Sequence, residues 1–199
     1  MNQLFRTVCA VLLLVLTACN LVACNDIPTP NIISKPGTTT TIIMVRHAER
    51  DPGLDPPLNT EGIARAQILA DVLGQNGVTA IYTMDAIRNR ETAQPLATKL
   101  GLTPSLVPVS QLLDTKALAK RLVAEWLSKH SGGVVLWIGN LGSTTTGQNG
   151  TLEEVYRLLG GTGNAPNRYQ DLHIVVVPEE GKGKASFIQT VYGPKSSLD

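Results

Sequence analysis

The segment TIIMVRHAER, residues 41–50, joins a short apolar run directly to a group of charged side chains. An uncharged apolar run of this length is typical of a strand that is buried on both faces of a parallel sheet. Open α/β sheets bind their ligands outside the carboxyl ends of the strands, which is where the charged side chains would lie. The segment therefore predicts a central strand with a binding site at its end.

Downstream, strand-like and helix-like patterns alternate along the chain. Apolar runs predict further strands at residues 80–83, 105–109, 133–138, 172–177 and 186–192. Apolar periodicity predicts helices over 60–74, 88–100 and 117–129, and a capping box at Thr151–Glu154 opens a fourth helix that ends at Gly160-Gly161. This alternation predicts a three-layer α/β/α sandwich with a mostly parallel sheet, whose last two strands pair antiparallel at an edge.

Two of the predicted helices carry more detailed expectations. In the helix at 60–74, the residues expected to face the core are Ile63, Ala66, Ala70 and Leu73. The helix at 88–100 contains Pro95, so we expect it to begin later than Arg88 or to kink at the proline.

Composition excludes several classes of protein. Of the 199 residues, 43% are hydrophobic and 17% are charged, which allows a packed core and rules out wholesale disorder. A net charge of +1 and an aromatic content of 4% argue against a nucleic-acid-binding protein. The three cysteines are Cys9, Cys19 and Cys24, so the folded body has no disulfide scaffold, thiol nucleophile or cysteine-bound metal.

The first residues are typical of a secretory signal. Arg6 supplies a positive n-region, and the uncharged run at 7–18 is shorter than the ~20 residues that cross a bilayer. Leu16-Thr-Ala-Cys19 resembles the bacterial lipobox, at which cleavage exposes a cysteine that is then acylated, and Leu21-Val-Ala-Cys24 fits the same pattern. We favour Cys19 because it directly follows the apolar run. An uncleaved signal anchor from Thr7 to about Cys24 is the alternative.

These features divide the chain into three predicted segments. They are a lipoprotein signal peptide at 1–18, a tether rich in proline and threonine at 19–40, and a folded domain at 41–199. Removal of Arg6 with the signal leaves the mature chain formally neutral, so membrane attachment would depend on acyl chains. The expected location is the bacterial cell envelope, outside the cytoplasm, in the periplasm or at the cell surface, with the lipid anchor holding the protein to a membrane.

Polar residues follow three of the predicted strands. Arg46 and His47 follow the first strand, RNRETA at 88–93 follows the second around a helix start, and Gly139-Asn140 ends the long run at 133–138. Arginine forks match phosphate oxygens, and a helix N-terminus adds N–H donors. An imidazole with two guanidinium groups at one sheet edge therefore suits a small dianion.

The same residues resemble the signature blocks of the histidine phosphatase superfamily, which has a phosphoglycerate-mutase-like fold. RHAER at 46–50 is similar to the first block, and PLNTEGIARA at 57–66 is similar to the family's "PLT..G..QA" segment. AIYT at 80–83, followed by RNRETAQPLA at 88–97, resembles the second block. Residues 133–139 resemble the strand that normally ends in "GH", and residues 169–177 and Tyr192-Gly193 resemble the family's final segment. The resemblance covers about residues 40–193 in the family's order.

The resemblance implies a phosphatase that hydrolyses phosphomonoesters in two steps. His47 would attack phosphorus and form a phosphohistidine that water then hydrolyses, while Arg46 and Arg88 clamp the phosphoryl oxygens and stabilise the transition state. No metal and no other cofactor are required. The partner would be a small phosphorylated substrate or ligand, with no role for nucleic acid.

Asn140 departs from the family pattern, because it stands where a second pocket histidine is expected. His130 and His173 do not match that position and are interpreted as structural or surface residues. An asparagine can still donate a hydrogen bond to a phosphate oxygen but cannot carry a positive charge. The change predicts a loss of about tenfold or more in binding and in transition-state stabilisation.

Several other roles remain open at the level of sequence. Arg90 is a rival of Arg88, although the spacing to Thr92-Ala93 favours Arg88. Glu49 and Arg50 are interpreted as a surface ion pair. The general acid is unassigned, and the candidates by position are Asp85 and Asp114, which could equally be a turn residue and a helix N-cap.

Two functions follow from these patterns. The first is a lipid-anchored extracytoplasmic phosphatase that uses His47, with activity weakened by Asn140. The second is a catalytically inactive lipoprotein of the same fold that binds a phosphorylated or other anionic ligand.

Overall fold

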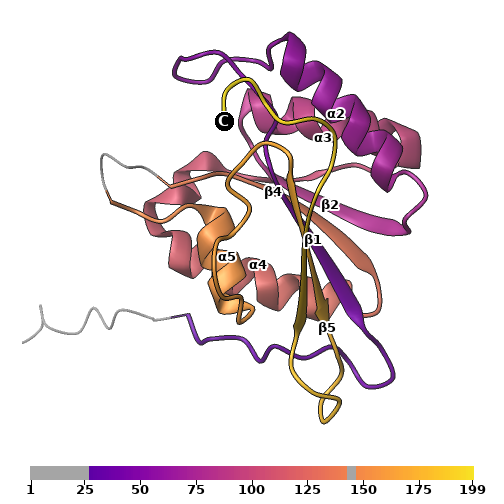
Figure 1. Ribbon diagram of the computed structural model, residues 1–199. Helices are drawn as coiled ribbons and strands as arrows, with labels where there is room; N and C mark the ends of the chain where they lie inside the picture. Colours follow the sequence, from indigo (N-terminus) through magenta and orange to yellow (C-terminus); the bar gives the residue numbers. More distant parts are fainter. Residues whose placement is uncertain (1–26, 143–146) are drawn as a thin grey trace, which may run out of the picture.

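The computed structural model describes residues 27–142 and 147–199, which form a three-layer α/β/α sandwich (Figure 1). The predicted signal sequence and both candidate lipidation sites, Cys19 and Cys24, lie outside the described residues. Within the described ranges, no helix is long and apolar enough to cross a membrane.

The middle layer is one six-stranded sheet. Its strands are β1 (Thr40–Arg46), β2 (Val78–Met84), β3 (Ser105–Val107), β4 (Val134–Gly139), β5 (Asp171–Val177) and β6 (Ser186–Val191), in the spatial order β3-β2-β4-β1-β5-β6. The first four strands pair in parallel: β1 with β4, β4 with β2, and β2 with β3. β5 pairs antiparallel with both β1 and β6. The predicted fold class is confirmed, including the antiparallel pair at the edge.

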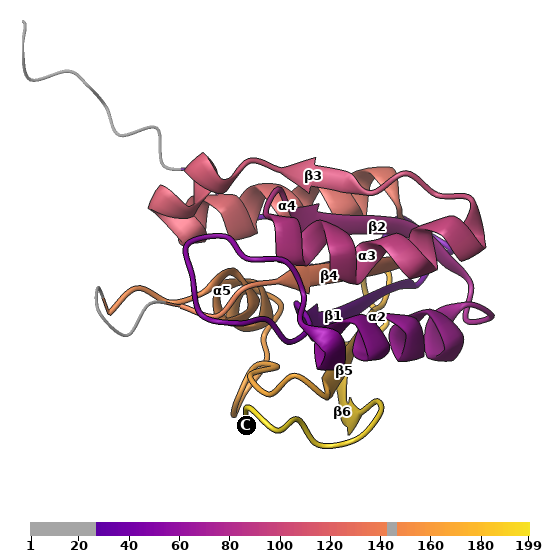
Figure 2. The same ribbon diagram turned by 90° about the horizontal axis from the view of Figure 1, so that it is seen from above.

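Two helices cover each face of the sheet (Figure 2). They are α2 (Thr60–Leu73) and α3 (Ile87–Leu100) on one face, and α4 (Thr115–Lys129) and α5 (Thr151–Leu158) on the other. β1 is buried on both sides, because Ile43 and Val45 pack with α2 and α3 while Ile42 and Met44 pack with α4 and α5. Burial on both faces is the physical reason why the residues of β1 form an unbroken apolar run.

The position of β1 in the sheet sets the position of the polar residues that follow it. β1 lies beside β4, with Arg46 in register with Gly139. The His47 N–H continues this pairing and donates a hydrogen bond to the Gly139 carbonyl at 3.2 Å. The residues that end the two strands therefore lie next to each other at one edge of the sheet.

The structure corrects several details of the sequence analysis. Ile63 is 63% exposed, and α2 instead buries the face that contains Arg65, Ala66 and Leu69. α3 begins at Ile87 and is helical through Pro95, so the later start is wrong. The strand predicted at 105–109 ends at Val107 and is followed by a 3-10 helix, η1 (Val109–Asp114), which the sequence patterns did not predict.

The capping box predicted at Thr151–Glu154 is also wrong. Gly150 is the N-cap of α5, and Thr151 is the first helical residue. The Thr151 hydroxyl accepts a hydrogen bond from the Asn140 backbone N–H at 3.0 Å. Thr151 thus connects the start of α5 to the residue after β4.

The described part of the predicted tether contacts the domain. Ser34 is buried, and its hydroxyl donates to the Val177 carbonyl at 2.6 Å and shares a hydrogen bond of 2.7 Å with the Thr40 hydroxyl. Nearer the N-terminus, Lys120 of α4 donates to the Ile27 carbonyl at 2.8 Å. Residues 27–39 are therefore held against the same domain that they precede.

Candidate active site

The structure brings Arg46, His47, Arg88 and Asn140 to one cavity of about 400 Å³ at the carboxyl ends of β1 and β4. Arg88 comes from the start of α3, which follows β2 in the chain. The other residues that line the cavity are Arg50, Leu112, Thr115, Leu141, Gly142, Gln148, Asn149 and Gly150. The four residues predicted from sequence therefore share one site, and Arg50 joins them there.

His47 is 5% exposed and has a fixed orientation. Its Nδ1 lies 2.8 Å from the Ala48 carbonyl oxygen. A carbonyl can only accept, so Nδ1 carries the proton in the neutral ring and donates it to Ala48. The lone pair of a neutral imidazole is then on Nε2, the atom that could act as a nucleophile or hydrogen-bond acceptor.

The surroundings of His47 hold it in the neutral form. Burial and the positive charges of Arg88, Arg46 and Arg50 lower the pKa of His47 to about 3, against the opposing effect of the Ala48 hydrogen bond. An uncharged ring keeps its nucleophilic lone pair at physiological pH. The arginines thus add to the effect of burial in keeping the imidazole unprotonated, and their positive charges favour an anion in the cavity.

This shift predicts a specific dependence of stability on pH. Below its ordinary pKa of about 6.5, His47 takes up a proton in the unfolded chain but not in the folded one. The contribution of the neutral His47 ring to the free energy of unfolding is complete above pH ~6.5. This contribution is lost as the pH falls towards 3, by up to ~1.4 kcal/mol per pH unit. Urea unfolding at pH 6.5 and 5 should show the wild type losing about 2 kcal/mol more than His47→Asn. Equal losses in the two proteins would contradict the shift.

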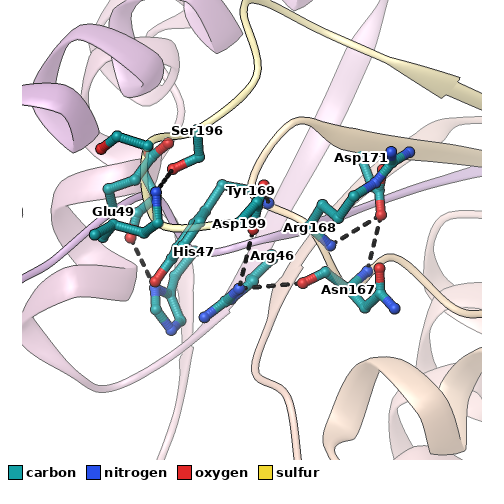
Figure 3. Close-up of polar contacts among 12 residues, drawn as sticks. Arg46, His47, Glu49, Asn167, Arg168, Tyr169, Asp171, Ser196 and Asp199 are labelled. Atoms are coloured by element: carbon teal, nitrogen blue, oxygen red, sulfur yellow. Dashed lines mark hydrogen bonds and ion pairs between the residues drawn. The ribbon is translucent and has the colours of Figure 1, made fainter.

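Arg46 is held by residues from the segment before β5 and by Asp199 at the end of the chain (Figure 3). Its NH1 donates to the Asn167 carbonyl at 3.1 Å and lies 3.9 Å from the Asp199 carboxylate. Its guanidinium carbon lies 3.7 Å from the centroid of the Tyr169 ring, which is close enough for a cation–π contact. These contacts orient the planar guanidinium towards the cavity and reduce the entropy lost when it binds an anion.

The segment that holds Arg46 is itself anchored. The Asp171 carboxylate accepts from the backbone N–H groups of Asn167 and Arg168, at 3.1 and 2.9 Å, and pairs with the Arg168 guanidinium (Figure 3). The sequence analysis assigned no role to Asn167 or Asp199. It included Tyr169 only in the segment at 169–177 that resembles the final segment of the family's sequence pattern.

Arg88 is held by a carboxylate from the loop between β1 and α2. Its NH1 donates to Asp55 Oδ1 at 3.0 Å, and the same carboxylate accepts from the Ile87 N–H that begins α3. Arg90, its rival in the sequence, pairs with Asp85 instead and does not line the cavity. The structure thus places Arg88, and not Arg90, in the site.

Asn140 lines the site, and its side-chain oxygen is buried. Its side chain is 7% exposed, and its Oδ1 is buried without a hydrogen-bond partner among the described residues. Its backbone is fixed at both ends, because the N–H donates to Thr151 and the carbonyl accepts from the Leu152 N–H at 3.3 Å. The backbone of Asn140 is therefore fixed at the point where the residue lines the cavity.

The surface ion pair expected between Glu49 and Arg50 is wrong. Glu49 is fully buried and pairs with Arg65 of α2, whose Nε donates to both carboxylate oxygens at 2.7 and 2.8 Å. α2 can approach closely because position 62 is glycine, where a Cβ atom would lie 2.1 Å from the Glu49 carbonyl oxygen. Arg50 instead extends towards the cavity.

None of the described residues that line the cavity carries a carboxylate. The two candidate general acids are engaged elsewhere, since Asp85 pairs with Arg90 and Asp114 caps α4 by accepting from the Ala117 N–H at 2.9 Å. His130 and His173 also lie away from it, against Tyr82 and Tyr156. Within residues 27–142 and 147–199, no group of three or more His, Cys, Asp or Glu side chains could hold a metal ion.

Fold and site together define an α/β protein with a cavity that groups three arginines around a neutral histidine. Residues 42–177 match the histidine phosphatase superfamily (branch 1). The chain belongs to this superfamily.

Three known proteins illustrate the relationship. An 8-oxo-(d)GTP phosphatase of Mycolicibacterium smegmatis is 33% identical over 102 residues, which is 46% of this chain and 32% of that protein. The chain thus spans about a third of that relative. A mycobacterial glucosyl-3-phosphoglycerate phosphatase has the same fold, with a TM-score of 0.51 and 18% identity over 77% of this chain and 98% of that one. The protein histidine phosphatase SixA, solved with tungstate, gives a TM-score of 0.51 and 21% identity over 76% and 96%. The family and these relatives support a phosphatase activity.

Proposed function

We propose that this protein hydrolyses phosphomonoesters through a phosphohistidine on His47. The observation that carries the proposal is the geometry of His47, a buried neutral imidazole in a cavity with Arg46 and Arg88. Its Nδ1–H is bound to Ala48, and its Nε2 has no hydrogen-bond partner among the described residues. This is the arrangement that an in-line attack on phosphorus needs, with a nucleophile and two fixed guanidinium groups.

The reaction proceeds in two displacements. Nε2 forms a bond to phosphorus while the bond from phosphorus to the ester oxygen breaks, and the leaving oxygen takes the electron pair. Water then attacks the phosphohistidine, the P–N bond breaks, and inorganic phosphate and neutral His47 are released. Since no described residue lining the cavity carries a carboxylate, the leaving oxygen departs as an anion or takes its proton from water.

The test is release of phosphate from a chromogenic aryl phosphate, since a phenolate leaves without needing a proton. Arg88→Ala should lower kcat/KM by about 10²-fold or more, because it removes a fixed charge from the transition state. Arg90→Ala is the matched control, since Arg90 lies on the same helix and pairs with Asp85 outside the cavity. Equal rates for the Arg88 and Arg90 variants would contradict the proposed site, and a wild type without activity would contradict the proposed function.

The second candidate function is binding of a phosphorylated ligand without turnover. Asn140 favours it, because a neutral amide stabilises the charge of a transition state less than an imidazolium does. A wild type that releases no phosphate but is stabilised by vanadate in a thermal melt would support this function. Loss of that stabilisation in Arg46→Ala would locate the binding in the same cavity.

The proposed location is the bacterial cell envelope, outside the cytoplasm, with a lipid on Cys19 or Cys24. The support is the lipobox-like sequence at each cysteine, together with the apolar run before them. Metabolic labelling with a palmitate analogue tests the anchor. Cys19→Ser should abolish labelling, whereas loss only in Cys24→Ser would move the anchor to the second site.

A further inference from the structure

We infer that a cavity beside His173 is a second ligand-binding site, and that it takes a neutral polyhydroxylated group such as a monosaccharide. The cavity has a volume of about 570 Å³, within the range of small-molecule sites. It is separate from the catalytic cavity, because no described residue lines both. The inference goes beyond the proposed function and does not depend on it.

The cavity lies where the helical layer leaves part of the sheet uncovered. α5 has only 8 residues, and its Tyr156 packs against Phe187 of β6, with ring centroids 5.4 Å apart. At the start of β5, the same face of the sheet is covered by residues 164–168 instead of a helix. The cavity lies between this segment and the pair of strands β5 and β6.

Two polar side chains are buried on this face of β5. Asp171 and His173 are 5% and 6% exposed, and the next residues on the same face, Val175 and Val177, belong to the apolar core. The burial of Asp171 is compensated by its hydrogen bonds to the segment at 167–168. His173 has no such compensation, because its Nδ1 is buried without a partner among the described residues. Packing alone therefore does not account for a histidine at this position.

The ring of His173 presents a hydrogen-bond donor to the cavity. Burial lowers the pKa of His173 and Arg168 lowers it further, against the opposing charge of Asp171, so the ring is neutral and carries one proton at physiological pH. A buried N–H without an acceptor is rare, which places the proton on Nε2 instead of Nδ1. Since Nδ1 is buried, Nε2 is the nitrogen that faces the cavity.

Gln189 presents an acceptor beside this donor. It lies directly opposite His173 in the antiparallel pair of β5 and β6, so their Cβ atoms are roughly 5 Å apart. The Gln189 amide nitrogen donates to the Tyr156 hydroxyl at 2.8 Å and to the Asn164 carbonyl at 3.4 Å. These bonds leave the amide oxygen available for a ligand. An N–H donor next to a carbonyl acceptor matches a hydroxyl group, which both accepts and donates.

The cavity offers polar groups without a free charge. Among the described lining residues, the charged ones are Arg168 and Asp171, which pair with each other at 2.8 Å (Figure 3). The amide side chains of Asn164 and Asn167 add further donors and acceptors to the wall. This composition favours a neutral molecule with several hydroxyl groups, whereas the three arginines of the catalytic cavity favour an anion.

NMR of the histidine side chains tests the inference, because the chain has only three histidines. The ring Cε1–H signals of His47, His130 and His173 are assigned from single His→Gln variants. They are then followed while D-glucose, D-ribose or myo-inositol is added to the full chain. The His173 signal should shift and saturate with at least one of these probes, while the signals of His47 and His130 stay in place.

The outcomes that would overturn the inference are distinct. A His173 signal that moves with none of the three probes would overturn the site. A sugar that shifts the His47 signal and not that of His173 would place binding in the catalytic cavity. Acetate that shifts the His173 signal when no sugar does would overturn the neutral class of ligand. Failure of the proposed function is read separately, from the release of phosphate from an aryl phosphate.

Cavity variants show whether the shift reports direct binding. Gln189→Ala should raise the Kd of the bound probe by about 3- to 10-fold, because it removes one neutral hydrogen bond. Gln94→Ala is the matched control and should leave the Kd unchanged, since Gln94 is an exposed amide of α3 that binds Thr98. If Gln189→Ala weakens the fold through its lost bond to Tyr156, Asn164→Ala removes an exposed side chain of the same wall. A Kd that is unchanged in both cavity variants would overturn the site.

Discussion

Replacing His47 by alanine is expected to lower phosphate release from an aryl phosphate by on the order of 10⁴-fold, the scale seen when a nucleophile is removed from a preorganised site. The substitution removes the only described imidazole that lines the cavity and leaves Arg46 and Arg88 in place. Phosphate binding should survive, because the guanidinium groups that attract the anion remain. The variant should therefore lose kcat while its Kd for phosphate changes little.

A trapping experiment separates the nucleophilic role of His47 from a role in positioning. Rapid acid-free quenching of wild type with a ³²P-labelled ester should capture a phosphoprotein that is stable in base and labile in acid, as P–N bonds are. His47→Ala should capture none. His130→Gln is the matched histidine control, since His130 contacts Tyr82 away from the cavity. Labelling that persists in the His47 variant would overturn the assignment.

Replacing Glu49 by alanine is expected to destabilise the fold by about 3–5 kcal/mol, because it leaves the Arg65 charge buried without its counter-ion. Arg65 is 2% exposed, and its remaining partners are the backbone carbonyls of Tyr192 and Pro194, at 3.2 and 2.9 Å. For a domain of this size the loss corresponds to a decrease in Tm of roughly 10 °C. Thermal and urea unfolding measure it directly.

Two further variants show that burial is the cause. Asp71→Ala removes the partner of Lys99 in an exposed pair and should change stability by less than about 0.5 kcal/mol. Glu49→Leu combined with Arg65→Met removes both buried charges and should recover much of the loss. Equal losses of stability in the Glu49 and Asp71 variants would show that the buried ion pair contributes no more to the free energy of unfolding than the exposed one.

Much of the fold could be predicted because its signals are local. The apolar run at 41–45 reflects a strand that is covered on both faces, and Gly101 follows α3 with a φ of +65°, the left-handed conformation that glycine adopts readily. Ile63 was misassigned because helical spacing fits more than one face, and the buried ion pair selects the face that contains Arg65. Thr151 satisfies the pattern of a capping residue, but its hydroxyl binds Asn140 instead of its own helix.

The candidate site was predictable in part, for a related reason. Arg46, His47 and Arg88 lie within motifs that directly follow predicted parallel strands. Because the carboxyl ends of such strands lie at the same edge of a sheet, the sequence indicates that the three residues are close together. The roles of Asn167, Asp199 and Glu49 depend on contacts between distant segments, which no local pattern records. Arg50 was misinterpreted because its neighbour Glu49 suggested a pair, whereas successive residues after the strand point in different directions and Glu49 turns inwards.

The contacts around Arg46 and Arg65 also bear on how the protein is made. Arg46 binds a carbonyl 121 positions further along the chain, and Arg65 binds carbonyls 127 and 129 positions further along. Contacts of such separation form only after long loops close, at a cost in chain entropy that early segments cannot offset alone. During translation His47 is synthesised long before Asn167. The nascent chain thus carries His47 through most of synthesis before the residues that hold Arg46 exist, and the cavity is completed only when the last strands dock.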